Sequence, residues 1–227
     1  CFLYCGRLNL SSALPLMAAE EGWNTTQLGI LSSVFFWTYG IGHLINGRLG
    51  EIIGINRFII SAVILSAAAN RLIGFQSSLL VIALLWGLNG YFQSMAWAPG
   101  MSLLSKWWPS NRRGFAAGFA NGFAGFGQAV CMGVVIIIFA VIPQAGWRAA
   151  FFYPALIAVI LSVLYAYGIK ETPHAAGLPE YTDNVTSTAS ELKINASLRG
   201  KSKLYPYIYL IKEWKFDVWL LIIALSS

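Results

Sequence analysis

Charged side chains are scarce in this sequence of 227 residues. Asp, Glu, Lys and Arg together make up 11% of it, whereas hydrophobic residues make up 57%. Because a soluble domain carries about 25% charged residues, this composition excludes an ordinary soluble protein. It predicts an all-α membrane protein that crosses the bilayer several times, since helices satisfy their own backbone groups in lipid.

The sequence also lacks the spacing of a metal site or a disulfide framework. Its cysteines, Cys1, Cys5 and Cys131, all lie in apolar runs, where small core residues are expected. We therefore expect neither a metal nor a cofactor. Lys and Arg outnumber Asp and Glu by 15 to 9, but they lie in short connections between apolar runs, where positive charge sets membrane topology. The lipid bilayer is therefore an expected partner, and nucleic acid is not.

Six apolar runs are long enough to cross about 30 Å of hydrocarbon. They cover residues 1–18, 28–50, 57–75, 78–107, 114–142 and 147–168. Residues 1–168 therefore predict a six-helix transmembrane bundle whose first helix is truncated. Residues 169–215 are polar and predict a linker, and residues 216–227 predict the start of a seventh helix. We expect the sequence to be a fragment, half of a two-half carrier.

Lys and Arg are distributed unevenly among the connections. Those after helices 1, 3 and 5 hold only Arg71 and Arg148, whereas those after helices 2, 4 and 6 hold most of the rest. The positive-inside rule then predicts that the N-terminus and the linker face the cytoplasm. We expect a multi-pass protein of the plasma membrane, or of the inner membrane in a Gram-negative cell.

Arg7 is the strongest functional signal, because it is a cation inside an apolar run. If helix 1 leaves the membrane near Ala18, Arg7 lies about 16 Å deep, close to the bilayer midplane. A guanidinium there costs at least about 2.5 kcal/mol, and the other apolar runs hold no acidic residue. We expect Arg7 to face an aqueous cavity and bind carboxylate or phosphate. The alternatives are a backbone carbonyl or an acid beyond this sequence.

Polar side chains recur on single faces of the fourth and fifth predicted helices. Asn89, Gln93 and Trp97 follow one another at i, i+4 and i+8, and Asn121 lies on the next helix. Since polar groups in hydrocarbon need partners, the two helices are expected to enclose a cavity. Hydrogen bonds between helices, or packing in the case of Trp97, are the alternative explanation.

The first two predicted helices add further polar candidates. Tyr4 lies one turn before Arg7, and Tyr39, His43 and Asn46 follow one another at i, i+4 and i+7. A histidine in a membrane helix forms a hydrogen bond to a neighbouring helix as often as it binds a substrate. If His43 lines the cavity, its imidazole is a candidate to carry a proton.

The segment after the second predicted helix, residues 47–57, is similar to the loop motif of the major facilitator superfamily. Gly47, Glu51, Gly54 and Arg57 occupy the motif positions. Further matching pieces follow in order along the chain: Arg7-Leu8-Asn9, Tyr39-Gly40, Gly90-Tyr91-Phe92-Gln93, Trp107-Trp108, Trp147-Arg148 and Thr172-Pro173. Together they resemble the organophosphate:phosphate antiporters of that superfamily, which carry glycerol 3-phosphate and hexose phosphates.

The resemblance implies a monomeric twelve-helix carrier whose two halves rock about a central site. It implies exchange of a phosphorylated sugar or glycerol phosphate for inorganic phosphate, without enzymatic chemistry. Arg7 would hold the phosphate together with an arginine of helix 7, and Tyr4, Gln93, Trp97 and Asn121 would line the cavity.

Two departures from the family pattern concern the positive charge near the substrate. His43 stands where the glycerol-phosphate carriers have a lysine, and Ala124 stands where they have a histidine. Tyr39 and His43 are also expected to bind the substrate. Because less positive charge faces the substrate than in those carriers, the identity of the anion is left open.

Other functions also remain open from the sequence. Residues 7–11, Arg-x-Asn-Leu-Ser, are similar to the anion:cation symporters of hexuronates, which implies an organic acid as cargo. A carrier-like sensor would bind a sugar phosphate without translocating it. A membrane enzyme is disfavoured, because the apolar runs hold no cluster of acid, base and nucleophile.

Overall fold

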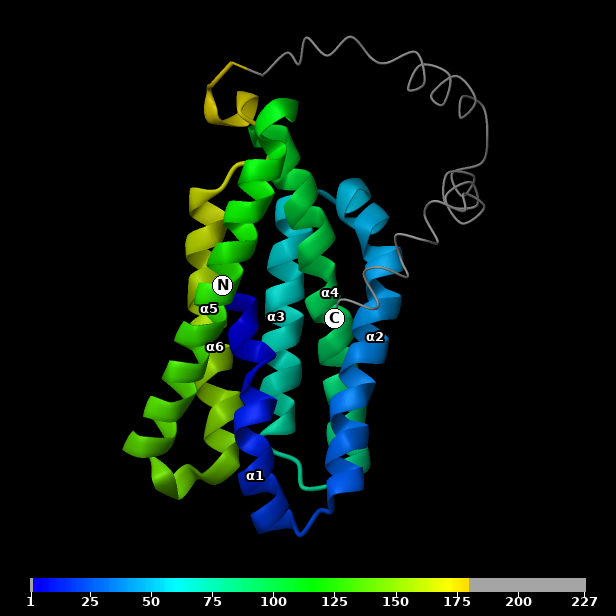
Figure 1. Ribbon diagram of the computed structural model, residues 1–227, viewed down its shortest axis with the longest axis vertical. Coiled ribbons are helices and arrows are strands. Elements are labelled where there is room, and N and C mark those ends of the chain that lie inside the picture. Colours follow the sequence, from blue (N-terminus) through cyan, green and yellow to red (C-terminus); the bar gives the residue numbers. More distant parts are fainter. Residues whose placement is uncertain (1, 180–227) are drawn as a thin grey trace. The chain divides into compact units, whose positions relative to one another are not determined.

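The computed structural model describes residues 2–179, and the regular elements of that part are all helices (Figure 1). In chain order, with η for a 3-10 helix, they are η1 (Phe2–Gly6), α1 (Asn9–Glu21), α2 (Thr25–Ile53), α3 (Ile55–Ile73), α4 (Leu79–Trp107), η2 (Ser110–Arg112), α5 (Arg113–Val141), η3 (Pro143–Arg148), α6 (Ala149–Gly168) and η4 (His174–Ala176). The prediction of an all-α membrane fold is confirmed. The linker beyond residue 179 and the seventh helix at 216–227 lie outside the described residues.

Within residues 2–179, five helical segments are long and apolar enough to cross a membrane. They are Thr25–Ile53, Ile55–Ile73, Leu79–Trp107, Ser110–Val141 and Pro143–Gly168. Their bounds agree with five of the predicted runs to within a few residues, because long apolar stretches dominate these positions.

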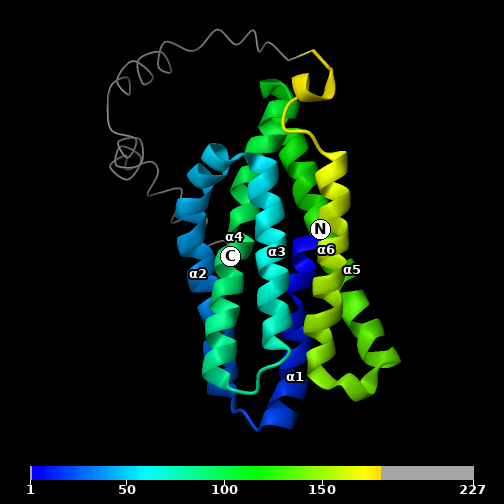
Figure 2. The same cartoon turned by 180° about the vertical axis from the view of Figure 1, so that it is seen from behind.

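Helix α4 lies between α2 and α3, and α3 also packs on α6. Helix α5 lies on the opposite side of the bundle from α2, beside α6 and η1 (Figures 1 and 2). Small residues let α2 and α4 approach closely: a methyl group at Gly42 would overlap Ser94, and one at Gly90 would overlap Thr38. The buried core is rich in aromatic side chains, with the Trp86 ring 5.0 Å from that of Phe35.

The first predicted helix is broken, which corrects the expectation of a continuous run over residues 1–18. Residues Phe2–Gly6 form a 3-10 helix, and the α-helix begins only at Asn9. The backbone N–H groups of Arg7 and Leu8 both donate to the carbonyl of Tyr4, at 3.1 and 3.0 Å. The two helical pieces therefore meet at Arg7 and Leu8.

The connection between α2 and α3 is shorter than the loop motif suggested. Helix α2 continues to Ile53 and α3 begins at Ile55, so the predicted turn over residues 47–57 is helical except at Gly54. Gly54 has φ +101° and ψ 125°, a conformation that L side chains rarely adopt.

The segment that follows α6 is bonded to the ends of two other helices. Glu171 accepts a hydrogen bond from the backbone N–H of Asn56 at 2.8 Å, which caps the first turn of α3. The side-chain amide of Asn56 donates to the carbonyl of Ile169 at 2.8 Å. On α4, the indole N–H of Trp107 donates to the carbonyl of Lys170 at 3.0 Å. We call residues 169–171 the α6 strap.

Candidate functional site

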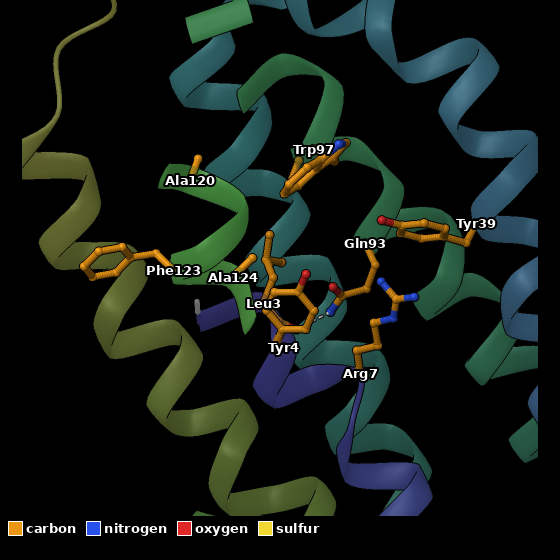
Figure 3. Close-up of a pocket in the computed structure, with 10 residues that line it drawn as sticks. Leu3, Tyr4, Arg7, Tyr39, Gln93, Trp97, Ala120, Phe123 and Ala124 are labelled. Carbon is orange, nitrogen blue, oxygen red and sulfur yellow. Dashed lines mark hydrogen bonds between the residues drawn. The ribbon is translucent and has the colours of Figure 1, made fainter. Parts of the chain in front are cut away.

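A cavity of about 330 Å³ opens between η1, α2, α4 and α5. Its lining residues are Leu3, Tyr4, Arg7, Tyr39, Gln93, Ala96, Trp97, Ala120, Phe123 and Ala124 (Figure 3). This volume lies at the small end of the range for pockets that bind small molecules. The cavity brings together five of the seven predicted binding residues: Tyr4, Arg7, Tyr39, Gln93 and Trp97.

The Arg7 guanidinium points between Gln93 and Tyr39 in the cavity (Figure 3). Its central carbon lies 4.7 Å from the centroid of the Tyr39 ring, 5.5 Å from that of Phe35 and 5.8 Å from that of Phe36. Ring faces attract a cation without satisfying all of its N–H donors. The guanidinium is therefore held in place and still has donors to offer to an anion.

The acidic residues of the described chain are all engaged at helix ends. Glu20 and Glu21 pair with Arg148 at 3.8 and 3.1 Å. Glu51 pairs with Arg48 at 2.8 Å, and Glu171 caps α3 through Asn56. Among residues 2–179 no carboxylate pairs with Arg7. The same residues contain no group of His, Cys, Asp and Glu side chains that could hold a metal ion.

Gln93 faces the cavity with its oxygen rather than with its N–H groups. Its Nε2 donates to the carbonyl of Leu3 at 3.0 Å and to Ser66 Oγ at 2.8 Å, which uses both amide hydrogens. The remaining Oε1 can only accept a hydrogen bond. Gln93 therefore suits a hydroxyl group of a ligand and not its anionic oxygens.

Asn89 shares a helix face with Gln93 but does not line the cavity. It is fully buried, with an exposed fraction of 0%, and its Nδ2 donates to the carbonyl of Gly6 at 2.8 Å. Asn9 is buried as well and donates to Asn70 Oδ1 at 2.7 Å. With Asn70, these amides form a buried polar network that donates to the Gly6 carbonyl of η1, and we call it the buried wall.

His43 and Asn46 lie outside the lining of the cavity. The His43 ring packs against Tyr39 with centroids 4.3 Å apart, and its Nδ1 lies 3.0 Å from the Tyr39 carbonyl oxygen. Asn46 is buried and donates to Ser94 Oγ at 2.7 Å, which joins α2 to α4. A direct role of His43 in binding stays a prediction.

Asn121 is exposed on α5, and its Nδ2 donates to the carbonyl of Ala117 at 3.1 Å. The α5 residues that do line the cavity are Ala120, Phe123 and Ala124. Ala120 and Phe123 were not predicted to line the cavity. Both are apolar, and an apolar residue of a membrane helix can face either a cavity or lipid. Ala124 was noted only as a departure from a family pattern.

The loop-motif residues lie at the end of α2 and the start of α3, away from the cavity lining. Glu51 forms its exposed ion pair with Arg48, one turn earlier on α2. Arg57 is exposed in the first turn of α3, and Gly47 is half-buried in α2 against Ala98. A gating role for Gly47, Glu51, Gly54 and Arg57 stays a prediction.

Known proteins similar to this chain are membrane carriers and a sensor. A "Probable hexose phosphate transport protein" of Chlamydia muridarum is 27% identical over 224 residues, covering 94% of this chain and 48% of the relative. A "Probable sulfoacetate transporter SauU" of Cupriavidus necator is 32% identical over 170 residues, covering 75% and 39%. A "Membrane sensor protein UhpC" of Escherichia coli is 26% identical over 210 residues, covering 91% and 47%.

The chain spans between 39% and 48% of the length of these curated relatives. The family model described as the Major Facilitator Superfamily matches residues 1–227, the whole of the chain. Together with the five membrane-length apolar helices, this match makes the chain an integral membrane protein, and it belongs to the Major Facilitator Superfamily.

Proposed function

We propose that this chain supplies one half of the substrate site of a secondary active transporter. Its cargo is a phosphorylated sugar or glycerol phosphate, exchanged for inorganic phosphate by alternating access. The observation that carries the proposal is Arg7, a cation that faces the cavity while the described carboxylates are engaged elsewhere. The hexose phosphate relative supports this class of cargo.

The hydrogen-bond donors of the lining residues bind the phosphate, and the free acceptor binds a hydroxyl group of the cargo. Arg7 donates to the phosphate oxygens, and the Tyr4 hydroxyl lines the same cavity as a second donor. Gln93 Oε1 accepts from a hydroxyl of the sugar or glycerol, because both hydrogens of Nε2 are already used. Neutralising the cation lowers the cost of closing the cavity, and the halves then rock to open the other side.

Counterflow in proteoliposomes made with the intact protein tests the proposal. Arg7→Lys keeps the positive charge but loses the two-pronged N–H pattern, so we expect phosphate-driven uptake to fall by about tenfold or more. Arg71→Lys is the matched control, because Arg71 lies in the last turn of α3 outside the cavity lining. Wild-type uptake by the Arg7→Lys protein refutes the assigned role.

Two competing functions give different results in the same experiment. A sensor, the role in the name of the Escherichia coli relative, binds a sugar phosphate without any counterflow. A carrier of non-phosphorylated anions, which the name of the sulfoacetate relative favours, exchanges sulfoacetate or a hexuronate and ignores inorganic phosphate. Either pattern overturns the phosphate-exchange proposal.

The proposal includes the surroundings of the carrier. We place the N-terminus and the segment after α6 on the cytoplasmic side, because basic residues flank the α2–α3 and α4–α5 junctions. They are Arg48, Arg57, Lys106, Arg112 and Arg113. The carrier works as a monomer in the plasma membrane, or in the inner membrane of a Gram-negative cell. Protease or thiol-label accessibility from each side of the membrane tests this orientation.

A further inference from the structure

The break in the first helix removes the usual partner of one backbone carbonyl, that of Gly6. In a continuous α-helix this carbonyl would accept from the N–H of Leu10. Here Leu10 donates to Asn9 Oδ1 at 3.0 Å instead, and the backbone N–H groups of Arg7 and Leu8 donate to Tyr4. The Gly6 carbonyl therefore needs partners from other helices.

Amide side chains of α3 and α4 supply those partners. Asn89 Nδ2 donates to the carbonyl of Gly6 at 2.8 Å and Asn70 Nδ2 at 3.2 Å. Gln93 Nε2 adds a hydrogen bond to the carbonyl of Leu3 at 3.0 Å, within the 3-10 helix η1. Without the two asparagines, the buried Gly6 carbonyl would stay unsatisfied in a membrane-embedded bundle, which is costly.

The amides are themselves fixed by further hydrogen bonds in the buried wall. Asn89 Oδ1 accepts from Ser66 Oγ at 2.6 Å and from Asn70 Nδ2 at 3.2 Å. Asn70 and Asn89 both have an exposed fraction of 0%. A network in which each member has its partners specifies one arrangement, because every alternative breaks several bonds at once.

Gly6 lets this wall approach the backbone. A methyl group on Gly6 would lie 3.1 Å from Gln93 Nε2 and Ser66 Oγ, and 3.2 Å from Asn70 Nδ2. These distances are tighter than ordinary van der Waals contact, so any side chain here would push the amides away from the carbonyls.

We propose that Asn89 and Asn70 are positioning residues of the anion site. They hold the carbonyl of Gly6, and thereby fix the turn at Arg7 that presents the guanidinium and Tyr4 to the cavity (Figure 3). This inference rests on the proposed function for its effect on anion binding. It does not rest on it for the placement of residue 7, which is measurable without any anion.

The first experiment measures the placement of residue 7 directly. Arg7→Cys is introduced into the intact protein with all other cysteines replaced, and the rate of labelling by a charged methanethiosulfonate reagent is recorded. Adding Asn89→Leu should change that rate by about tenfold. Asn46→Leu is the matched control, because Asn46 is equally buried but donates to Ser94 on α4. It should leave the rate unchanged.

The second experiment measures the dissociation constant for inorganic phosphate in the protein that retains Arg7. Asn89→Leu should raise it by about tenfold, and Asn46→Leu should not. Gly6→Ala provides a milder variant in case Asn89→Leu fails to fold, and it should act in the same direction. Gly29→Ala, a position with open space around it, is its control. Thermal unfolding of every variant identifies any that do not fold.

The outcomes separate the two proposals. An unchanged labelling rate in a folded Asn89→Leu or Gly6→Ala protein overturns the positioning role, whether or not an anion binds. If the unaltered protein binds none of inorganic phosphate, glycerol 3-phosphate and glucuronate, the proposed function fails, and the labelling rates still decide the positioning role. Equal effects of Asn89→Leu and Asn46→Leu on labelling also overturn it, because they indicate a general loss of packing.

Discussion

The guanidinium carbon of Arg7 lies 4.7 Å from the centroid of the Tyr39 ring, so a cation from the first helical segment rests on an aromatic face of α2. Such a contact contributes about 0.5–1 kcal/mol when exposed and about 2 kcal/mol or more when desolvated. It stabilises the charge without neutralising it. The guanidinium is therefore stabilised in its apolar surroundings and keeps N–H donors for the anion of the proposed function.

The Tyr39 ring should matter more than its hydroxyl. Tyr39→Phe keeps the aromatic face, so we expect the phosphate dissociation constant to stay within about threefold of the unaltered value. Tyr39→Leu removes the face and should weaken binding by about tenfold. Isothermal titration with inorganic phosphate measures both. Equal losses in the two variants would instead assign the effect to the hydroxyl.

Adding a titratable cation at Ala124 should strengthen anion binding at low pH. Ala124 lines the same cavity as Arg7, and a histidine there gains a positive charge as the pH falls. We expect Ala124→His to bind phosphate several-fold more tightly than the unaltered protein at about pH 5, and no more tightly at about pH 8. Ala129→His, on an exposed part of α5, is the control. A similar gain in the control would show that only the overall charge matters.

Gly54→Ala should destabilise the protein, because Gly54 joins α2 to α3 at φ +101°. A residue forced into such a conformation costs about 1–3 kcal/mol. Gly100→Ala is the comparison, since Gly100 lies within α4 and has open space around it. Thermal unfolding in detergent should show a lower midpoint for Gly54→Ala only. A matching midpoint for the two variants would contradict the strain argument.

Glu21 should contribute more to stability than its neighbour Glu20. Arg148 pairs with Glu21 at 3.1 Å and with Glu20 at 3.8 Å, and the two carboxylate side chains are 16% and 41% exposed. We expect Glu21→Gln to lower the free energy of unfolding by about 1 kcal/mol, and Glu20→Gln by less than about 0.5 kcal/mol. The reverse order would mean that the longer contact is the stronger one in solution.

Much of the fold was predictable from the sequence. The bounds of α2 to α6 agree with the predicted runs to within a few residues, because long apolar stretches interrupted by polar connections permit few other arrangements in a membrane. The break at Arg7 and Leu8 was not predictable in this way. At this break the Gly6 carbonyl accepts hydrogen bonds from Asn70 and Asn89. These two residues lie on α3 and α4, far along the chain, so local sequence gives no sign of them.

The candidate site was predictable in part, for a similar reason. Periodicity placed Asn89, Gln93 and Trp97 on one helix face, but a face is wide enough to serve two environments. Asn89 turns to the buried wall, Trp97 to the cavity, and Gln93 bonds the wall while lining the cavity. On α2, periodicity likewise placed Tyr39 and His43 on one face. Tyr39 lines the cavity, whereas the His43 ring packs against Tyr39 outside the lining.

The α6 strap has a mechanical consequence for the end of the bundle where α3 begins and α4 ends. Glu171, Ile169 and Lys170 each hold a group from one of those two helices. Fraying of any one terminus would strip partners from the others, so the three termini open together or remain closed together. A helical bundle built this way yields at that end as one cooperative unit, and not helix by helix.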